Sequence, residues 1–546
     1  MRSPRTLPRS GGPPRSLAPL LALVPLVPLV ALLHCGAGEA PPAGVTFPPV
    51  DAAIAPPPDA STTADATTAD ARAPDATPAD AAPLDASDAA VDAADAAVRY
   101  LPTFYAVNHV LSTGQSLSVG SQGTPVLSTS QPFDNRMLNT GVLRSATRAT
   151  SFLPLVEGSV ETMSSGLANL VADVAQTEVL FGLPAPNDRH RLLVSCHGIG
   201  GTAYVGLKKG TAAFTSGLNQ VRDAKTIATA AMESYVVRAV TNVHGESDHV
   251  AGNATYAADL AEWQSDYETE VKAITGQTEP IPMFHTQMSS WTKYGQATSA
   301  IPLQQLEASI VSNGKIVLVG PKYNVQYAPD GVHLTAAGYR HMGEYYAKVY
   351  RRVVLEGRRW EPLRPVSATL TGDEIRVKFV VPVAPLVFDT TTVTDPGNKG
   401  FEYVDDSASP PTITAVTLEG PDTVRIKLSA APVGAGKTIR YAATGAVGAR
   451  AGATTGPRGN LRDSDTSRSR DGDKLENWAV HFAIPVPNAD DRARRKLNQP
   501  WPARRRCRAA RRSRASTRAR PPSPARRPDR TTRAPARRAP PCWRNR

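Results

Sequence analysis

The residues best able to do chemistry are Asp330 and His333, in the run Tyr327-Ala328-Pro329-Asp330-Gly331-Val332-His333-Leu334-Thr335. A carboxylate and an imidazole three residues apart on a loop can turn toward one point, where the carboxylate orients the ring and the ring removes a proton from a hydroxyl. The chain offers that hydroxyl far upstream, at Ser116 in Gly114-Gln115-Ser116. Either motif alone also fits an ordinary turn or helix cap. Together they predict a serine nucleophile with a His–Asp partner.

The basic charge of the chain is confined to one end. The whole sequence has 61 Lys+Arg, 49 Asp+Glu and a formal net charge of +12. Residues 491–546 hold 21 Lys+Arg and 2 Asp+Glu, which leaves 40 basic and 47 acidic residues in 1–490. The body of the protein is therefore mildly acidic, and we expect no nucleic-acid partner for it.

The N-terminus predicts export. Residues 1–35 begin with arginines and continue into a short apolar run, as in a signal peptide. Three prolines and the short apolar run argue against the alternative, a spanning helix, which needs about 20 residues. Leu32-Leu33-His34-Cys35 resembles a bacterial lipobox, so Cys35 is a lipidation candidate that would tether the chain to a membrane, although His34 departs from the usual small residue. The alternative is ordinary cleavage near residues 38–40. We expect the protein in the cell envelope or outside the cell.

Two segments predict disorder. Residues 36–98 are rich in Ala, Asp, Pro and Thr and have too few large apolar groups to offset the entropy of ordering, so we expect a linker. Reading its aspartates as calcium ligands is the less favoured alternative, because the glycine and spacing of a calcium loop are missing. Residues 489–546 form an Arg/Pro-rich tail. This tail either binds polyanions or is the translated product of a frameshifted gene end.

Between these segments, residues 99–358 predict one α/β domain. Short apolar runs, mostly rich in β-branched residues, alternate with helical patterns, and this alternation indicates a mainly parallel sheet. The predicted strands are 106–111, 191–196, 235–240, 281–285 and 315–319, and the clearest predicted helices are 255–274, 303–311 and the segment after Thr335. In such sheets, sites form at the carboxyl ends of the strands. The loops at Ser116, 198–202, 244–248 and 330–333 should therefore share one edge.

These four loops can divide the work of ester hydrolysis. Ser116 would attack the acyl carbon after losing its proton to His333, which Asp330 orients. The negative oxygen that develops needs hydrogen-bond donors already in place. The backbone N–H groups of Ser116 and of a glycine in 198–202 are candidates.

In order along the chain, Gly114-Gln115-Ser116, Gly200-Gly201-Thr202, His244-Gly245-Glu246-Ser247-Asp248 and Asp330-Gly331-Val332-His333 resemble the four sequence blocks of SGNH-type (GDSL-like) esterases. The most similar branch is the sialate O-acetylesterase-like group, which includes acetylxylan esterases. The resemblance implies a three-layer α/β/α sandwich, acetylated carbohydrates as substrates, and no cofactor.

The resemblance also assigns roles by matching position. It implies Ser116, Asp330 and His333 as the triad, and Ser116 and Gly200 as oxyanion donors. His244 stands where this branch has a glutamine. The resemblance therefore implies that His244 replaces that glutamine as an oxyanion donor in this chain. Supporting roles fall to Gln115, Gly201, Gly245 and Glu246, while Glu246 and Asp248 also fit as braces of their loop.

We expect no metal site. His197, His249 and His285 do not have the spacing of a helix-borne zinc pair, and we expect them to face solvent or to lie behind the site. Cys196 ends a predicted strand and should be a buried, free cysteine. The other cysteines, Cys35, Cys507 and Cys542, leave no disulfide framework to infer.

Residues 359–488 predict a separate β-sandwich, because short alternating strands are divided by Gly, Pro and Asp turns. Its predicted strands are 374–381, 412–418, 423–428 and 478–482, and we expect a scaffold or accessory role. For the whole chain, the favoured hypothesis is a monomeric serine esterase that removes acetyl groups from carbohydrates. The alternatives are a hydrolase of lipid or other small esters and a non-catalytic carbohydrate-binding protein of the cell surface.

Overall fold

The computed structural model describes residues 105–177 and 190–488. The predicted signal peptide with Cys35, the linker and the Arg-rich tail lie outside the described residues. Within the described ranges, no helix is long and apolar enough to cross a membrane.

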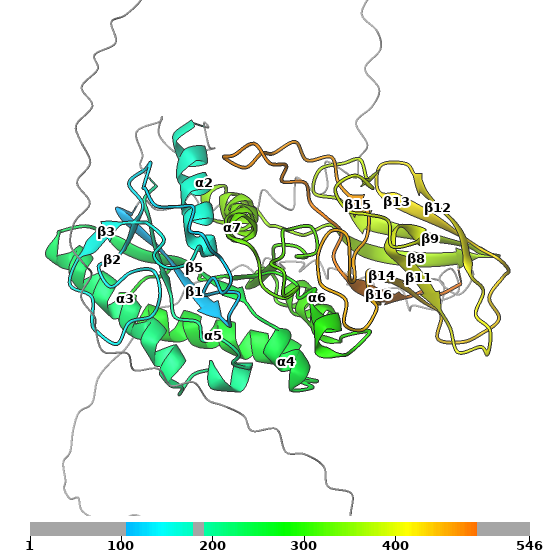
Figure 1. Cartoon of the computed structure of the whole chain (residues 1–546), viewed down its shortest axis with the longest axis horizontal. Coiled ribbons are helices and arrows are strands. Elements are labelled where there is room, and N and C mark those ends of the chain that lie inside the picture. The colour runs from blue at the N-terminus through cyan, green and yellow to red at the C-terminus, as the bar shows by residue number, and fades with distance from the viewer. Residues whose placement is uncertain (1–104, 178–189, 489–546) are drawn as a thin grey trace, which may run out of the picture. The chain divides into compact units, whose positions relative to one another are not determined.

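The first half of the described chain builds one mixed sheet (Figure 1). Its seven strands run in the spatial order β3-β2-β4-β1-β5-β6-β7. Neighbouring strands are parallel except for the antiparallel edge pair β2 and β3. The strands are β1 Val107–Gly114, β2 Arg136–Leu138, β3 Phe152–Pro154, β4 Leu192–Cys196, β5 Tyr235–Val243, β6 Met283–His285 and β7 Ile316–Leu318.

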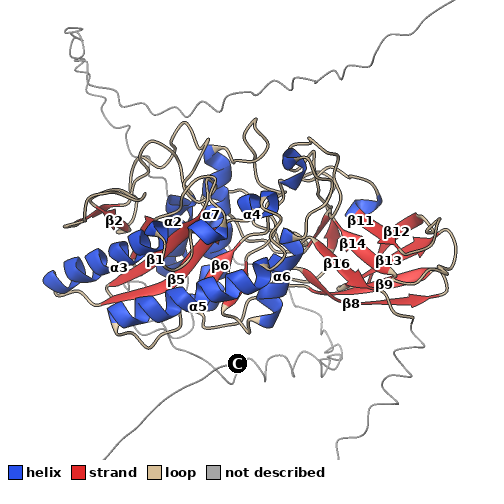
Figure 2. Cartoon of the chain, turned by 90° about the horizontal axis from the view of Figure 1, so that it is seen from below, coloured by secondary structure: helices blue, strands red, loops and turns tan. Residues whose placement is uncertain are grey.

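Helices cover both faces of this sheet (Figure 2). Successive strand residues point to opposite faces; accordingly Val110 joins the core under α2 and α7, and Leu111 joins the core under α3 and α5. The helices are α2 Met163–Thr177, α3 Ala212–Ala230, α4 Glu246–Val250, α5 Tyr256–Thr275, α6 Ile301–Val311 and α7 Ala336–Tyr350, with the short turns η1 Tyr204–Gly206 and η2 Trp291–Tyr294 and the π-helical turn η3 Arg351–Leu355.

Two glycines let α2 and α7 approach each other closely. A side-chain carbon at Gly166 would lie 2.2 Å from the Arg340 carbonyl oxygen, and one at Gly343 would lie 2.2 Å from the Met163 carbonyl oxygen. Since α7 begins at Ala336, directly after the Asp330–His333 loop, this contact also fixes where that loop ends.

The second half is antiparallel. One sheet has the order β12-β13-β9-β8, another has the order β11-β14-β16, and β10 pairs with β15. Residues from all three share one apolar core, which includes Ile375, Ile439 and Leu461. The strands are β8 Arg364–Thr371, β9 Glu374–Val380, β10 Val387–Phe388, β11 Phe401–Val404, β12 Ile413–Glu419, β13 Thr423–Leu428, β14 Thr438–Tyr441, β15 Leu461–Arg462 and β16 Phe482–Pro485, with the turn η4 Asn398–Gly400.

The predicted class, a mixed α/β domain with a parallel-rich sheet followed by a β domain, is confirmed. The observed helices and strands differ from the predicted ones where the sequence pattern is weak. Helices α2 and α3 were not predicted, and both carry many small or polar residues that blur the apolar period. The last strand begins at Phe482, whereas the prediction began it at Trp478, because Trp478 to Val480 form a buried irregular segment.

The α2–α7 contact gives a stability test. The Gly343→Ala variant should lose about 1–3 kcal/mol of unfolding free energy, because the new methyl group meets the Met163 backbone and overpacking of this kind costs that much. Chemical denaturation of the purified protein measures it. The matched control is Gly158→Ala, where a methyl group would meet nothing within 4 Å. Equal stability of the two variants would contradict the close approach of the helices.

Candidate active site

The structure brings the three predicted triad side chains together. Ser116 Oγ lies 2.7 Å from His333 Nε2, and His333 Nδ1 lies 2.6 Å from Asp330 Oδ2. Because a carboxylate can only accept, Nδ1 carries the proton and Nε2 is left to accept the Ser116 hydroxyl. The imidazole is 21% exposed, so a substrate can reach it while the protein still holds it.

A tight turn orients Asp330. The N–H groups of Val332 and His333 both donate to Oδ1, at 3.0 Å each, and Oδ2 is left to face the ring. Burial alone would raise the pKa of Asp330, but these hydrogen bonds and the His333 ring lower it below its ordinary value. Asp330 is therefore a stable anion beside the ring and does not compete for the proton.

Ser116 is presented at the end of β1. Gly114 has φ +127°, and a side chain there would collide with the Val243 carbonyl oxygen at 2.3 Å, so only glycine lets β1 turn sharply against β5. The Gln115 N–H then donates to that same carbonyl at 3.2 Å. This turn places Ser116 directly after the strand.

The loop after β4 runs along the end of β1. The N–H groups of His197 and Ile199 donate to the carbonyls of Ser112 and Gly114 at 3.0 Å each, and this pairing delivers Gly200 beside Ser116. A side-chain carbon at Gly200 would lie 3.8 Å from Ser116 Cβ. Among the described residues, the N–H groups of Ser116 and Gly200 make no backbone hydrogen bond, so both can donate to a substrate oxygen. Gly201 follows at the exposed tip of this loop, with φ +65°.

His244 does not face the nucleophile. Its Nε2 lies 3.0 Å from the Thr202 carbonyl oxygen and its Nδ1 lies 2.7 Å from the Tyr256 hydroxyl. Burial lowers the pKa of His244, so the ring is neutral and its single N–H is spent on the Thr202 carbonyl. The geometry therefore gives no support to the predicted oxyanion role of His244. The ring instead holds the loop that carries Gly200.

Gln115 and Glu246, predicted as supporting residues, are joined behind the serine. Gln115 Nε2 donates to Glu246 Oε2 at 3.0 Å, and Gln115 Oε1 accepts the Ser247 N–H at 3.0 Å. Gly245, with φ +140°, precedes α4, and Glu246, the first residue of that helix, is buried. Asp248 accepts the Tyr204 N–H at 2.8 Å, which agrees with its predicted bracing role.

A fully buried ion pair completes this region. Lys322 Nζ lies 3.2 Å from Glu246 Oε1, and the Ser290 hydroxyl donates to the same oxygen at 3.1 Å. Burial alone would raise the pKa of Glu246, but the Lys322 ammonium and the hydrogen bonds lower it. Lys322 could not be predicted as part of this region, because a lysine after a strand is usually exposed. Here it is 0% exposed.

The other histidines that the sequence raised are buried. His197, His249 and His285 are 0%, 5% and 1% exposed, so the expectation that they face solvent is wrong. His197 Nε2 bonds the Tyr267 hydroxyl at 2.6 Å, and burial lowers the pKa of His285 to about 3. In the described part of the chain, no three His, Cys, Asp or Glu side chains are grouped to hold a metal. Cys196 is buried and free, as predicted.

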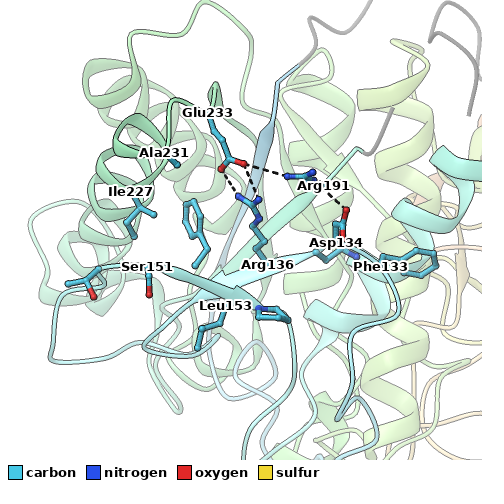
Figure 3. Close-up of a pocket in the computed structure, with 13 residues that line it drawn as sticks. Phe133, Asp134, Arg136, Ser151, Leu153, Arg191, Ile227, Ala231 and Glu233 are labelled. Atoms are coloured by element: carbon cyan, nitrogen blue, oxygen red, sulfur yellow. Dashed lines mark hydrogen bonds and ion pairs between the residues drawn. The ribbon is translucent and has the colours of Figure 1, made fainter. Parts of the chain in front are cut away.

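A cavity of about 590 Å³ lies elsewhere, beside β2 and β3 (Figure 3). Two of its arginines are already paired, Arg136 with Glu233, and Arg191 with Glu233 and Asp134. Arg136 is level with Leu193 near the start of β4, whereas Ser116 follows the far end of β1. The cavity therefore lies near the amino-terminal ends of the parallel strands, whereas Ser116 lies at their carboxyl ends. It is not the pocket of Ser116.

The buried Glu246–Lys322 ion pair leads to a second prediction, about the free energy of unfolding. Lys322→Met should cost about 3–5 kcal/mol of unfolding free energy, because it leaves the Glu246 carboxylate buried without a cation. Adding Glu246→Gln removes that charge and should restore a large part of the loss. Urea denaturation of both single variants and the double variant measures the coupling. Losses that simply add would mean that the two groups do not stabilise each other.

No family model matches the sequence, and no curated protein sequence matches it. Among solved structures, the fold is similar to a carbohydrate acetylesterase from Xanthomonas citri, with TM-score 0.45 and 14% identity over 69% of this chain and 80% of that one. It is also similar to a protein from Arabidopsis thaliana (TM-score 0.32, 17% identity, 44% and 97% covered) and to a carbohydrate acetylesterase from Sinorhizobium meliloti (TM-score 0.26, 11% identity, 44% and 97% covered). At these identities, the chemistry of this chain rests on its own side chains.

Proposed function

We propose that this chain is a serine carboxylic ester hydrolase. One observation carries the proposal: a serine hydroxyl, an imidazole and a carboxylate lie in a hydrogen-bonded row, with 2.7 Å between Ser116 Oγ and His333 Nε2 and 2.6 Å between His333 Nδ1 and Asp330 Oδ2. The three groups come from loops separated by more than 200 residues, since 217 positions divide Ser116 from His333. A chance turn or a local cap does not produce such a row.

The reaction would proceed in two halves. Ser116 Oγ forms a bond to the acyl carbon while its proton passes to His333 Nε2, and the imidazolium is stabilised by Asp330. The negative oxygen of the tetrahedral intermediate accepts from the N–H groups of Ser116 and Gly200. His333 then gives its proton to the leaving alcohol oxygen as the C–O bond breaks. In the second half, water takes the place of the alcohol and bonds to the acyl carbon while His333 Nε2 takes one of its protons. That proton returns to Ser116 Oγ as the acyl–Oγ bond breaks, which releases the carboxylic acid and the free serine.

For the substrate we propose an O-acetyl ester, with a carbohydrate as the alcohol. The support is the ordered set of four blocks, which resembles the sialate O-acetylesterase-like branch in the positions of Ser116, Gly200, Glu246 and the Asp330–His333 pair. In η2, the Tyr294 ring packs edge-on against His249 of α4, and the residue is 37% exposed, so an aromatic surface is open to a sugar or acyl group. Export, on the evidence of residues 1–35, would give the enzyme access to extracellular polysaccharide.

The Ser116→Ala variant tests the mechanism. It should lower kcat/KM for 4-nitrophenyl acetate by at least about 1,000-fold, because the nucleophile is lost while the oxyanion donors remain. Asp330→Asn should cost about 1,000- to 10,000-fold by favouring the wrong tautomer of His333. Thermal unfolding serves as the folding control. Full activity in Ser116→Ala would exclude the serine mechanism.

A substrate panel separates the remaining alternatives. Acetate release from acetylated xylan should exceed release of longer acyl chains from lipid esters by at least about tenfold per active site, because an acetyl pocket discriminates by the methylenes that it excludes. The matched control is Ser116→Ala on each substrate. Preference for long acyl chains would favour a lipid esterase. Binding of xylan with no hydrolysis of any ester would favour the non-catalytic carbohydrate-binding protein.

A further inference from the structure

A long loop of the β domain touches the turn that carries Asp330 and His333. This loop, residues 442–460 between β14 and β15, is called the β14–β15 loop below. The Ala451 N–H donates to the Gly331 carbonyl at 3.0 Å. A side chain at Gly331, where φ is +72°, would lie 2.5 Å from Arg450 Cβ, so the β-domain backbone rests directly on the turn.

The same loop is bonded to the segment around η2. The Thr292 hydroxyl donates to the Ala449 carbonyl at 2.8 Å, and the Gly448 N–H donates to the Thr292 carbonyl at 2.8 Å. Two residues before Thr292, the Ser290 hydroxyl donates to Glu246. The loop therefore contacts both the turn that carries Asp330 and His333 and the segment that contains Ser290.

A second route runs through His481, just before β16. Its Nε2 lies 2.8 Å from Ser289 Oγ and its Nδ1 lies 2.7 Å from the Ala442 carbonyl oxygen, at the start of the β14–β15 loop. Because the carbonyl can only accept, Nδ1 is the protonated nitrogen and Nε2 accepts from Ser289. His481 is 1% exposed, and its backbone N–H and carbonyl are both bonded to the Gln287 side chain, at 2.8 and 3.0 Å.

From Ser289 the buried contacts continue to the nucleophile. The Lys322 N–H donates to Ser289 Oγ at 3.4 Å, the Lys322 ammonium binds Glu246, and Glu246 accepts from Gln115, the residue before Ser116. Every side chain on this route is at most 2% exposed. A displaced member would leave a buried polar group without its hydrogen-bond partner, which is costly, so each side chain restricts the position of the next.

We propose that His481 and the β14–β15 loop are positioning elements of the active site, so that the β domain forms part of the catalytic unit. One route ends at Gln115 beside Ser116 and the other ends at Gly331 between Asp330 and His333. His481 belongs to both, because it bonds Ser289 on one side and the first residue of the loop on the other. This inference rests on the proposed esterase function.

Ser289→Ala tests the first route with a minimal change in volume. It should lower kcat for 4-nitrophenyl acetate by about 10- to 100-fold with KM within about twofold, because a small displacement of a reacting group costs that much. His481→Asn should act in the same way, since it keeps a donor for Ala442 and loses the acceptor for Ser289. His481→Gln, whose amide can reach the position of Nε2, should recover much of kcat.

The matched control is Tyr323→Phe. It removes another buried bond between the two domains, from the Tyr323 hydroxyl to the Ala479 carbonyl at 2.7 Å. Phenylalanine keeps the edge-on packing of the ring against His481, so the variant loses only a hydroxyl that belongs to neither route. This variant should lower the melting temperature about as much as Ser289→Ala and leave kcat within about twofold of the parent protein. Equal kcat in Ser289→Ala and Tyr323→Phe, at matched melting temperatures, would overturn the inference.

A readout that needs no turnover separates this inference from the proposed function. The low-field proton resonance of His333 Nδ1–H reports the bond to Asp330 in the resting protein. Ser289→Ala and His481→Asn should displace or broaden it, and Tyr323→Phe should not. If the parent protein hydrolyses no ester but the resonance follows this pattern, the proposed function fails and the positioning role stands. If all three variants keep the parent resonance, the positioning role fails whatever the activity.

Discussion

The buried pairing of Glu246 with Lys322 is the interaction on which the rest of the site depends. Two charges that are 1% and 0% exposed are costly unless hydrogen bonds satisfy them, so their neighbours have little freedom to move. Those neighbours are Gln115, which precedes the nucleophile, and Ser290, which precedes η2. The charge pair therefore adds little net stability but strongly restricts the geometry around it. Through Gln115, it restricts the position of Ser116.

The parts of the site that could be predicted from sequence are those set by topology. Apolar runs predicted the parallel strands, and parallel strands place their following loops at one edge, so Ser116, Gly200 and the Asp330–His333 pair could be expected to meet. The parts that could not be predicted depend on tertiary contacts. His244 has the right position in its motif, but Tyr256 and Thr202 occupy both of its ring nitrogens. No pattern in the sequence predicts that Tyr256 is the hydrogen-bond partner of His244.

The contacts of the β domain also could not be predicted from the sequence. Its alternating strands predicted a separate sandwich with a scaffold or accessory role. Three of the four predicted strands are present, as β9, β12 and β13, whereas the predicted strand 478–482 shares only Phe482 with β16. Strand β16 contacts α6, but other segments that contact the α/β domain are irregular loops, which carry no periodic signal. They include the β14–β15 loop and the segment around Asp465, whose carboxylate lies 3.0 Å from the partly buried Lys348 of α7. Residues that join two predicted domains are thus the hardest to assign from sequence, and here they lie beside the reacting groups.

The central claim is that Ser116 is an activated nucleophile. Its most direct measurement is mass spectrometry of the full chain after treatment with a fluorophosphonate ester, followed by peptide mapping. One phosphonyl group per molecule on Ser116, with a labelling rate that falls sharply in His333→Ala, is the predicted result. An unlabelled Ser116 in a protein that still hydrolyses 4-nitrophenyl acetate, or labelling at another residue that accounts for the activity, would contradict the claim.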